Sequence, residues 1–204
     1  MPNAIEMVDR QVLFLINGTN TPWLDNFFWA VTLPVTWIPL FLLFIWFLYL
    51  CYGKKCFRPL VFIILAILLA NHISADIIKP WVQRPRPTHT PELLSSLHLH
   101  LKSNGHYYYG GKYGFLSSHA ANNSVMAILI YTFTRPFHSK KVFLGTYLTL
   151  FTLLICYSRI YLCAHYLSDI IGGLLLGIAI SMLVHFLFTK YQNWCSNNSY
   201  FCRT

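Results

Sequence analysis

The sequence NFFWAVTLPVTWIPLFLLFIWFLYLCYG, residues 26–53, contains no Asp, Glu, Lys or Arg. Four later stretches share this property, at residues 59–75, 113–134, 142–158 and 170–189. A bilayer core of about 30 Å needs roughly 20 helical residues. In lipid, the backbone hydrogen bonds have to be satisfied within the segment itself. The pattern therefore predicts an all-α integral membrane protein with five transmembrane helices.

The overall composition excludes other classes of protein. Of the 204 residues, 56% are hydrophobic and only 10% are charged, whereas a soluble domain carries about a quarter charged residues. The net charge of +9 arises from 15 Lys and Arg against 6 Asp and Glu, but the polar surface that a nucleic-acid-binding domain needs is missing. Six cysteines are too few for a disulfide scaffold. We expect one membrane-embedded domain over residues 1–204, with no nucleic-acid partner.

Two other segments complete the expected topology. Residues 5–17 mix charged and apolar side chains, which predicts an amphipathic helix lying in the membrane interface. Pro34 and Pro39 fall early in the first apolar run and can break it, so a short sixth spanning segment before Pro34 is the alternative to five. The longest connection is a 36-residue outer loop over 79–114.

Basic residues in short connections indicate which side of a membrane protein faces the cytoplasm. The connections that five spans place on one side carry Lys54, Lys55, Arg58, Arg135, Lys140, Lys141, Lys190 and Arg203. We expect this side to be cytoplasmic, with Cys195 and Cys202 as free thiols in a reducing compartment. We expect the protein to lie in a bacterial inner membrane, so that the outer loop and the turn over 159–165 face the periplasm. The outer loop is also basic, which a functional need for cations there would explain.

Three polar clusters fall at helix ends on this outer side. They are KPWVQRPRP at 79–87, LSSH at 116–119 and SRIYLCAHYLSD at 158–169. Ionisable residues at the edge of a bilayer are costly without a purpose. Clusters that are distant in sequence but share one membrane level are what an active site needs.

The residue types in these clusters suit a phosphate group. Arg binds phosphate bidentately and Lys adds a compact positive charge, while a helix that starts at Ser117-Ser118 offers free N–H groups to an anion. Histidine can act as a nucleophile or a proton donor near neutral pH. His165 and Asp169 are spaced i, i+4, so the carboxylate can orient the ring. Too few acidic residues lie at this level to bind a divalent metal, and we expect no metal and no cofactor.

The spacing of these residues resembles the three motifs of the type 2 phosphatidic acid phosphatase (PAP2) family. The matching patterns are Lys79 with six residues before Arg86-Pro87, Ser117-Ser118-His119, and Ser158-Arg159 with His165 and Asp169. The resemblance covers residues 79–169. In the second motif this chain departs from the family's Pro-Ser-Gly-His, because Leu116 replaces the Pro and Ser118 replaces the Gly.

The resemblance implies a metal-independent reaction through a phosphohistidine. Carried over to this chain, it makes His165 the nucleophile, Asp169 its orienting partner, and His119 the general acid that protonates the leaving oxygen. The implied phosphate-binding residues are Lys79, Arg86, Arg159, Ser117 through a hydrogen bond, and Ser118 through its backbone N–H.

The leading hypothesis is an integral-membrane lipid phosphatase that hydrolyses a terminal phosphate from a lipid mono- or diphosphate. Undecaprenyl diphosphate, lipid A phosphate and phosphatidylglycerol phosphate are the candidate substrates, and an outward-facing site favours the first two. The alternative is a non-catalytic lipid-phosphate binder or transporter on the same fold, although binding alone would not need both His119 and His165. A vanadate-dependent oxidase is a more remote reading. The sequence makes no prediction of the oligomeric state.

Some neighbouring residues have simpler interpretations. Arg84 has no motif position, and we expect it to contact a lipid headgroup. The consecutive tyrosines at 107–109 fit an interfacial aromatic belt, with a substrate-facing lid as the alternative. The glycines of the last apolar run, Gly172, Gly173 and Gly177, predict close helix packing rather than a cofactor-binding loop.

Overall fold

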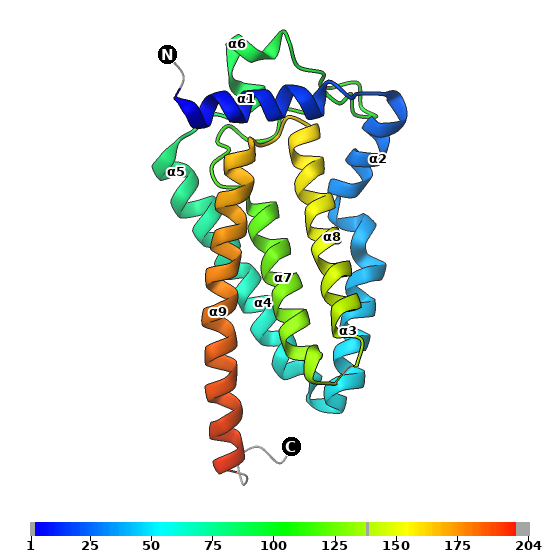
Figure 1. The fold of residues 1–204 in the computed structure, drawn as a ribbon, viewed down its shortest axis with the longest axis vertical. Coiled ribbons are helices and arrows are strands. Elements are labelled where there is room, and N and C mark those ends of the chain that lie inside the picture. Colours follow the sequence, from blue (N-terminus) through cyan, green and yellow to red (C-terminus); the bar gives the residue numbers. More distant parts are fainter. Residues whose placement is uncertain (1–2, 138, 199–204) are drawn as a thin grey trace.

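The computed structural model describes residues 3–137 and 139–198 and is a bundle of long helices that run side by side (Figure 1). Its central helix is α7 (Ser118–Thr134). Around α7 pack α3 (Ile38–Tyr52), α4 (Phe57–His72), α8 (Lys141–Tyr161) and α9 (Leu167–Asn197). Within the described residues, β-type pairing is confined to two isolated bridges, so the predicted all-α class is confirmed.

The first apolar run is helical but broken near its start. It forms α2 (Pro22–Thr32), the 3-10 turn η1 (Pro34–Trp37) and then α3. Leu33 has an extended backbone, as expected for a residue that precedes a proline. With 11 residues, α2 is only about 16 Å long. The segment before Pro34 is therefore too short to cross a bilayer by itself.

The second apolar run extends further than predicted. After α4 the helix continues through the π-helical turn η3 (Ile73–Ile78) into α5 (Lys79–Val82). Gln83 ends it with a left-handed backbone, φ 52. The outer connection thus begins after Val82 rather than at Lys79, and it continues to the start of α7. It contains the 3-10 turn η4 (Pro87–His89) and the short helix α6 (Pro91–Leu94).

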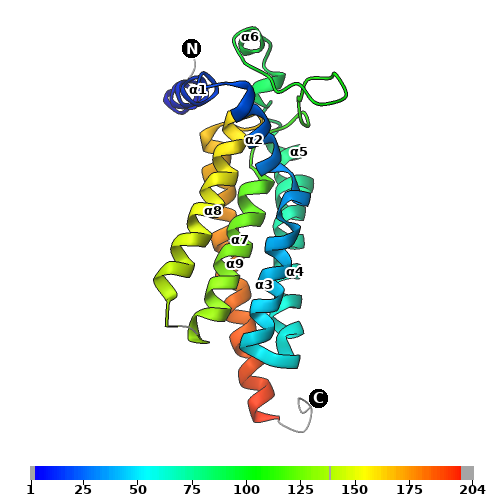
Figure 2. The same ribbon diagram turned by 90° about the vertical axis from the view of Figure 1, so that its right-hand side faces the viewer.

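The exterior of the bundle has the character of a lipid-facing surface. Within the part of the chain that the structure describes, three helical segments are long and apolar enough to cross a membrane, judged by length and composition: Pro34–Val82, Lys141–Tyr161 and Leu167–Asn197. The first of these folds back on itself at the turn η2 (Gly53–Cys56), so that α3 and α4 run in opposite directions (Figure 2). Large apolar side chains point outward, including Leu42 at 61% exposure and Met182 at 69%. Exposed apolar surface of this extent marks a protein embedded in a membrane, whereas the number of crossings stays a prediction.

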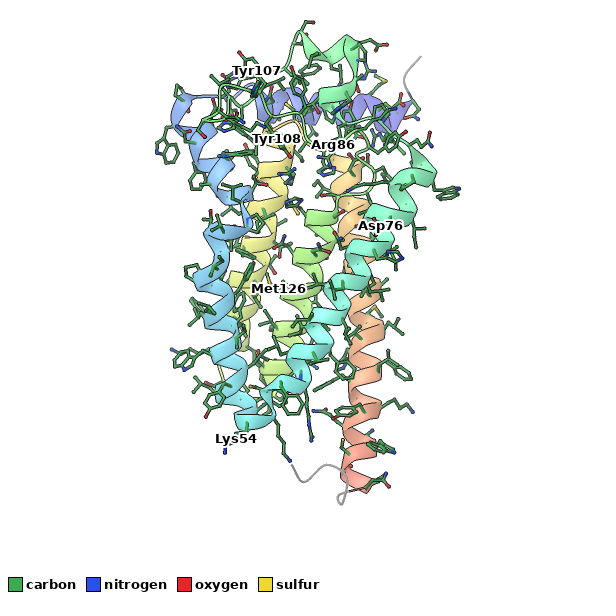
Figure 3. All side chains as sticks on the ribbon, turned by 180° about the vertical axis from the view of Figure 1, so that it is seen from behind. Lys54, Asp76, Arg86, Tyr107, Tyr108 and Met126 are labelled. Atoms are coloured by element: carbon green, nitrogen blue, oxygen red, sulfur yellow. The ribbon has the colours of Figure 1, made fainter. Side chains whose placement is uncertain are left out.

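The two ends of the bundle carry different connections. One end holds η2 and η5 (Arg135–Phe137), while the other is crossed by the outer connection. Figure 3 shows Lys54 at the first end, and Arg86, Tyr107 and Tyr108 at the second.

Two expectations about the C-terminal tail need separate comment. Arg203 and Cys202 lie outside the described residues. Cys195 is part of α9 and is disulfide-bonded. The expectation that Cys195 is a free thiol is therefore wrong.

The predicted N-terminal helix forms as α1 (Ala4–Asn17) and lies across the end of the bundle (Figure 1). Its buried residues are Asp9, Leu13 and Asn17, which share one helix face at i, i+4 spacing. Val8 and Leu15, by contrast, are 50% and 74% exposed. The helix therefore turns the Asp9 carboxylate toward the bundle together with Leu13 and Asn17, and leaves Val8 and Leu15 exposed.

Helices α7 and α9 approach each other closely at two glycines of α9. A Cβ atom on Gly177 would lie 1.7 Å from Ser124 Oγ, and one on Gly173 would lie 2.4 Å from the carbonyl oxygen of Ser117. Larger residues would push the helices apart, so the predicted close packing is confirmed. The contact brings the first turns of α7 and α9 together, and the Ser117 N–H donates to the Asp169 carbonyl oxygen at 3.0 Å.

Candidate active site

The three predicted clusters converge at the end of the bundle that α1 crosses. They come from α5 (Lys79), the outer connection (Arg86), the first turn of α7 (Ser117, Ser118 and His119), the last turn of α8 (Arg159), and the following turn with the start of α9 (His165 and Asp169). His119 interacts electrostatically with Lys79, Arg86, Arg159 and His165. The residues that the sequence assigns to catalysis and phosphate binding therefore share one site.

A tight turn between α8 and α9 places His165. Cys163 has a left-handed backbone, φ 53. The Arg159 carbonyl oxygen accepts hydrogen bonds from the Ala164 N–H at 2.9 Å and the His165 N–H at 3.2 Å. The His165 residue is 1% exposed, and its Nδ1 lies 3.4 Å from Asp169 Oδ2. The predicted pair thus forms, although His165 precedes the first residue of α9.

The carboxylate of Asp169 is fully buried and held from several directions. Its Oδ2 accepts a hydrogen bond from the Tyr166 N–H at 3.0 Å, and its Oδ1 accepts one from Arg84 Nη1 at 2.8 Å. A Cβ atom on Gly114 would lie 2.8 Å from Oδ2, so the outer connection can approach here only with glycine. A carboxylate fixed beside Nδ1 of His165 favours the tautomer that is protonated there and leaves the Nε2 lone pair free.

Burial holds the pKa of His165 well below its usual range, and the cations Arg86, Arg159 and Lys79 lower that pKa further. A hydrogen bond with the backbone of Gly114 opposes the shift. The imidazole is therefore neutral near pH 7 when no anion is bound. A neutral ring has the lone pair that a nucleophile needs.

Two arginines of the site are buried without a carboxylate partner. Arg86 is 8% exposed and Arg159 is 2% exposed, and neither forms an ion pair with any of the described residues. Arg86 Nε donates to the Tyr113 carbonyl oxygen at 3.1 Å. Buried charge without a counter-charge is costly, so these arginines, together with Lys79, are suited to binding an anion.

The start of α7 contributes hydrogen-bonding groups to this site. Ser117 is fully buried and caps the helix, because its Oγ accepts from the Ala120 N–H at 3.3 Å. Ser118 Oγ accepts from Lys79 Nζ at 2.9 Å. The serine that replaces the family's glycine at 118 therefore holds the Lys79 ammonium group in place, and the N–H groups of this first turn suit an anion.

Two neighbours of Arg159 were not predicted as site residues. Arg159 donates to the Tyr108 hydroxyl at 2.7 Å and also to the Thr32 hydroxyl. Tyr108 comes from the outer connection and Thr32 from the end of α2. Neither lies in one of the three motifs, and only the tertiary structure brings them to the site.

The interpretation of Arg84 as a lipid-headgroup contact is wrong. Arg84 forms ion pairs with Asp169 at 2.8 Å and with Asp9 of α1 at 2.7 Å. Asp9 is 1% exposed, and no motif assigned it a role. A sequence signal for Asp9 did exist, because it shares one face of this amphipathic helix with Leu13 and Asn17, at i, i+4 spacing.

A cavity of about 500 Å³ lies against the site, between α3, α4 and α7. At the end near the site its walls include Thr32, Ser118 and His119, and its other walls are mainly apolar, with Met126 and Ile130 among them. Figure 3 shows Met126 about halfway along the bundle. The site therefore adjoins an apolar space between the long helices, of the kind that binds the hydrophobic part of a ligand.

Comparison with known proteins assigns this geometry to a family. The PAP2 superfamily matches residues 59–193, which include all three clusters. Two similar proteins are both named lipid A 4'-phosphatase. The protein from Porphyromonas gingivalis is 31% identical over 90% of this chain and 73% of its own length. The protein from Bacteroides thetaiotaomicron is 31% identical over 90% of this chain and 78% of its own length.

Two crystal structures share the fold. The transmembrane PAP2 type phosphatidylglycerolphosphate phosphatase from Bacillus subtilis has a TM-score of 0.67 and 23% identity, covering 93% of this chain and 88% of that one. LpxE from Aquifex aeolicus has a TM-score of 0.58 and 24% identity, covering 86% of this chain and 93% of that one. The resemblance of the three motifs is thus confirmed, and the chain belongs to the PAP2 superfamily.

Proposed function

We propose that this PAP2-family enzyme hydrolyses the terminal phosphate of a membrane lipid through a phosphohistidine formed on His165. One observation carries the proposal: buried arginines without counter-charges lie in a site that adjoins an apolar cavity. The cations suit the phosphate, and the cavity suits a lipid tail. A water-soluble phosphate ester would not need this cavity.

The reaction would proceed in two balanced steps. In the first, Nε2 of His165 attacks phosphorus, the bond from phosphorus to the ester oxygen breaks, and His119 gives that oxygen a proton. In the second, water attacks phosphorus, the nitrogen–phosphorus bond breaks, and His119 takes a proton from the water. The cations of the site would hold the non-bridging oxygens throughout, and Asp169 would balance the positive charge on the phosphorylated ring.

Among the candidate substrates we favour a lipid A phosphate. Both relatives with this name are 31% identical over most of this chain, whereas the Bacillus neighbour, at 23% identity, shares the fold alone. Asn71, Asn122 and Asn123 line the cavity together with His119. Asn123 Nδ2 already donates to the His119 carbonyl oxygen at 2.8 Å, whereas the buried Oδ1 of Asn122 has no hydrogen-bond partner among the described residues. A lipid with amide or hydroxyl groups near its phosphate could donate to this oxygen, whereas a plain polyprenyl chain could not.

The first test is phosphate release by the purified protein from lipid A, undecaprenyl diphosphate and phosphatidylglycerol phosphate, with EDTA present. We propose that no divalent metal is needed, because three cations and helix N–H groups already balance the phosphate charge. His165→Ala should lower kcat by at least about 10⁴-fold, as the loss of a covalent nucleophile commonly does. His119→Ala should slow substrates with poor leaving groups more than those with good ones.

His106→Ala is the matched control, because His106 is an exposed histidine of the outer connection. Activity of His165→Ala within tenfold of the wild type would contradict the nucleophile assignment. Lipid-phosphate binding without any release would support the binder or transporter alternative. Restoration of EDTA-treated protein by magnesium or zinc would contradict metal independence.

The second test concerns the cavity. Ile130→Trp should fill part of it and lower kcat/KM for a long-chain lipid about tenfold, since each excluded methylene loses about 0.8 kcal/mol of burial. Hydrolysis of p-nitrophenyl phosphate, which has no tail, should be unchanged. Ile128→Trp is the control, because Ile128 lies on the same helix but lines a different cavity, between α7, α8 and α9. An equal loss of kcat/KM for both substrates, or an equal effect of both variants, would show that the lipid tail does not occupy this cavity.

We further propose five membrane crossings, formed by α2–α3, α4–α5, α7, α8 and α9, with the site facing the periplasm of a bacterial inner membrane. The basic turn residues Lys54, Lys55 and Arg135 lie in η2 and η5, which the positive-inside rule would place in the cytoplasm.

The third test decides the orientation. Single cysteines placed at Ser103 and at Ser139, both exposed, are treated with a membrane-impermeant thiol reagent on intact cells. Labelling at Ser103 and protection at Ser139 are expected, because Ser103 lies on the connection that crosses the site. The reverse pattern would invert the topology and place the reaction on the cytoplasmic leaflet.

A further inference from the structure

We propose that Arg84 is a positioning residue for His165, and that Asp9 of the N-terminal helix holds Arg84 in this role. The inference rests on the proposed function, since it concerns the ring that would carry the phosphoryl group. It extends the active site beyond the three motifs and into α1, a helix that lies outside the family match over 59–193.

The contacts of Arg84 distinguish it from the phosphate-binding cations. Its Nη1 donates to Asp169 Oδ1 at 2.8 Å and to Ser168 Oγ at 2.6 Å, and its Nη2 donates to Asp9 Oδ2 at 2.7 Å. Its guanidinium also lies 4.3 Å from the centre of the Tyr166 ring. Arg86 and Arg159 lack carboxylate partners, whereas Arg84 has two. Arg84 is therefore engaged with the protein and is not available to hold the substrate.

Through Asp169, Arg84 controls the plane of the carboxylate that faces His165. Asp169 Oδ1 accepts a hydrogen bond from Arg84. Its Oδ2 accepts one from the Tyr166 N–H and lies 3.4 Å from His165 Nδ1. Without the contact at Oδ1, the carboxylate could rotate and remove Oδ2 from the ring. A partner that fixes a ligand or catalytic group in this way commonly contributes 10- to 100-fold to activity, by the order of magnitude seen at metal sites.

Asp9 holds the other side of this network. Its Oδ1 accepts from the Ser168 N–H at 2.8 Å, and its Oδ2 accepts from the Ser168 hydroxyl at 2.5 Å. Ser168 is the second residue of α9, so a carboxylate from α1 satisfies a free N–H in the first turn of another helix. Such a contact is favourable both as a cap and with the helix dipole. It fixes α1 to the start of the helix that carries Asp169.

The charges of the network explain why two carboxylates are used. Asp9, Arg84 and Asp169 together carry one net negative charge, and His165 gains positive charge as it attacks phosphorus. If Asp9 were neutral, Arg84 would balance Asp169 alone and less negative charge would remain for the ring. The expected loss is therefore in the chemical step and not in substrate binding.

The test compares Asp9→Asn and Arg84→Gln with the control Arg10→Gln. Arg10 also lies on α1, but its ion pair with Glu92, at 3.4 Å, is largely exposed. Asp9→Asn and Arg84→Gln should lower kcat for p-nitrophenyl phosphate about 10- to 100-fold, with little change in KM, and Arg10→Gln should match the wild type. Arg84→Lys should not restore kcat, because one ammonium cannot span both carboxylates.

A binding measurement by calorimetry separates this inference from the proposed function, because it needs no turnover. Orthovanadate can bond to Nε2 of a well-oriented His165, whereas sulfate needs only the cations. Asp9→Asn and Arg84→Gln should weaken vanadate binding about tenfold or more while leaving sulfate binding unchanged. Absence of wild-type lipid hydrolysis would count against the proposed function alone.

Three results would overturn the inference. The first is a kcat and a vanadate affinity within twofold of the wild type in both variants. The second is an equal loss of vanadate and sulfate binding, which would make Arg84 a phosphate ligand. The third is the appearance of the same defects in Arg10→Gln. If Arg84→Gln gives no folded protein, the double variant Asp9→Asn/Arg84→Gln carries the same comparison, because it removes the buried ion pair as a unit.

Discussion

The structure of the site depends on positive charge that is buried without a counter-charge. Arg86 and Arg159 are almost inaccessible to solvent, and the carboxylate of Asp169, which lies in the same site, is already paired with Arg84. Such an arrangement is unfavourable in an empty protein, and a bound dianion would relieve it. The low dielectric environment that makes the cations costly would also make them strong ligands for a phosphate in the proposed reaction, and for the charge that would develop during its transfer.

The fold keeps these groups together by close helix packing at one end of the bundle. Gly173 brings α9 against the first turn of α7, and a hydrogen bond from the Ser117 N–H to the Asp169 carbonyl oxygen joins the two turns. At Cys163 the backbone is left-handed, and the chain turns so that the His165 N–H donates to the Arg159 carbonyl oxygen. Groups that would otherwise repel one another are thus held by backbone contacts that do not depend on the ligand.

Much of the fold could be predicted because lipid imposes simple rules. Charge-free runs of adequate length have to be helices, and each of the five runs is largely helical in the structure. The sequence also predicted which residues share the site. The three motifs lie at helix ends on the same side of the bundle, so their residues lie at the same level of the membrane. The predicted helix start at Ser117-Ser118 is confirmed, because α7 begins at Ser118. The extension of the second run through a π-helical turn depends on local hydrogen bonds that composition does not report.

The residues that sequence reasoning missed are those whose roles arise only from tertiary contacts. Arg84 lies two residues from a motif arginine, yet it binds carboxylates rather than lipid or phosphate. Asp9, Thr32 and Tyr108 come from three separate segments that meet the site only after folding. Their residue types give no distinctive signal in the sequence, and their contacts with the site follow only from their positions in the fold.

The central claim is that His165 becomes covalently phosphorylated, and trapping that intermediate tests it most directly. The protein is mixed with its lipid phosphate substrate, quenched in alkali within milliseconds, and digested for mass spectrometry, since phosphohistidine is stable in alkali and labile in acid. The account predicts one phosphoryl group on His165, formed before phosphate is released and absent from His165→Ala. Release of phosphate at the normal rate with no phosphohistidine at any time, or with the label on another residue, would contradict it.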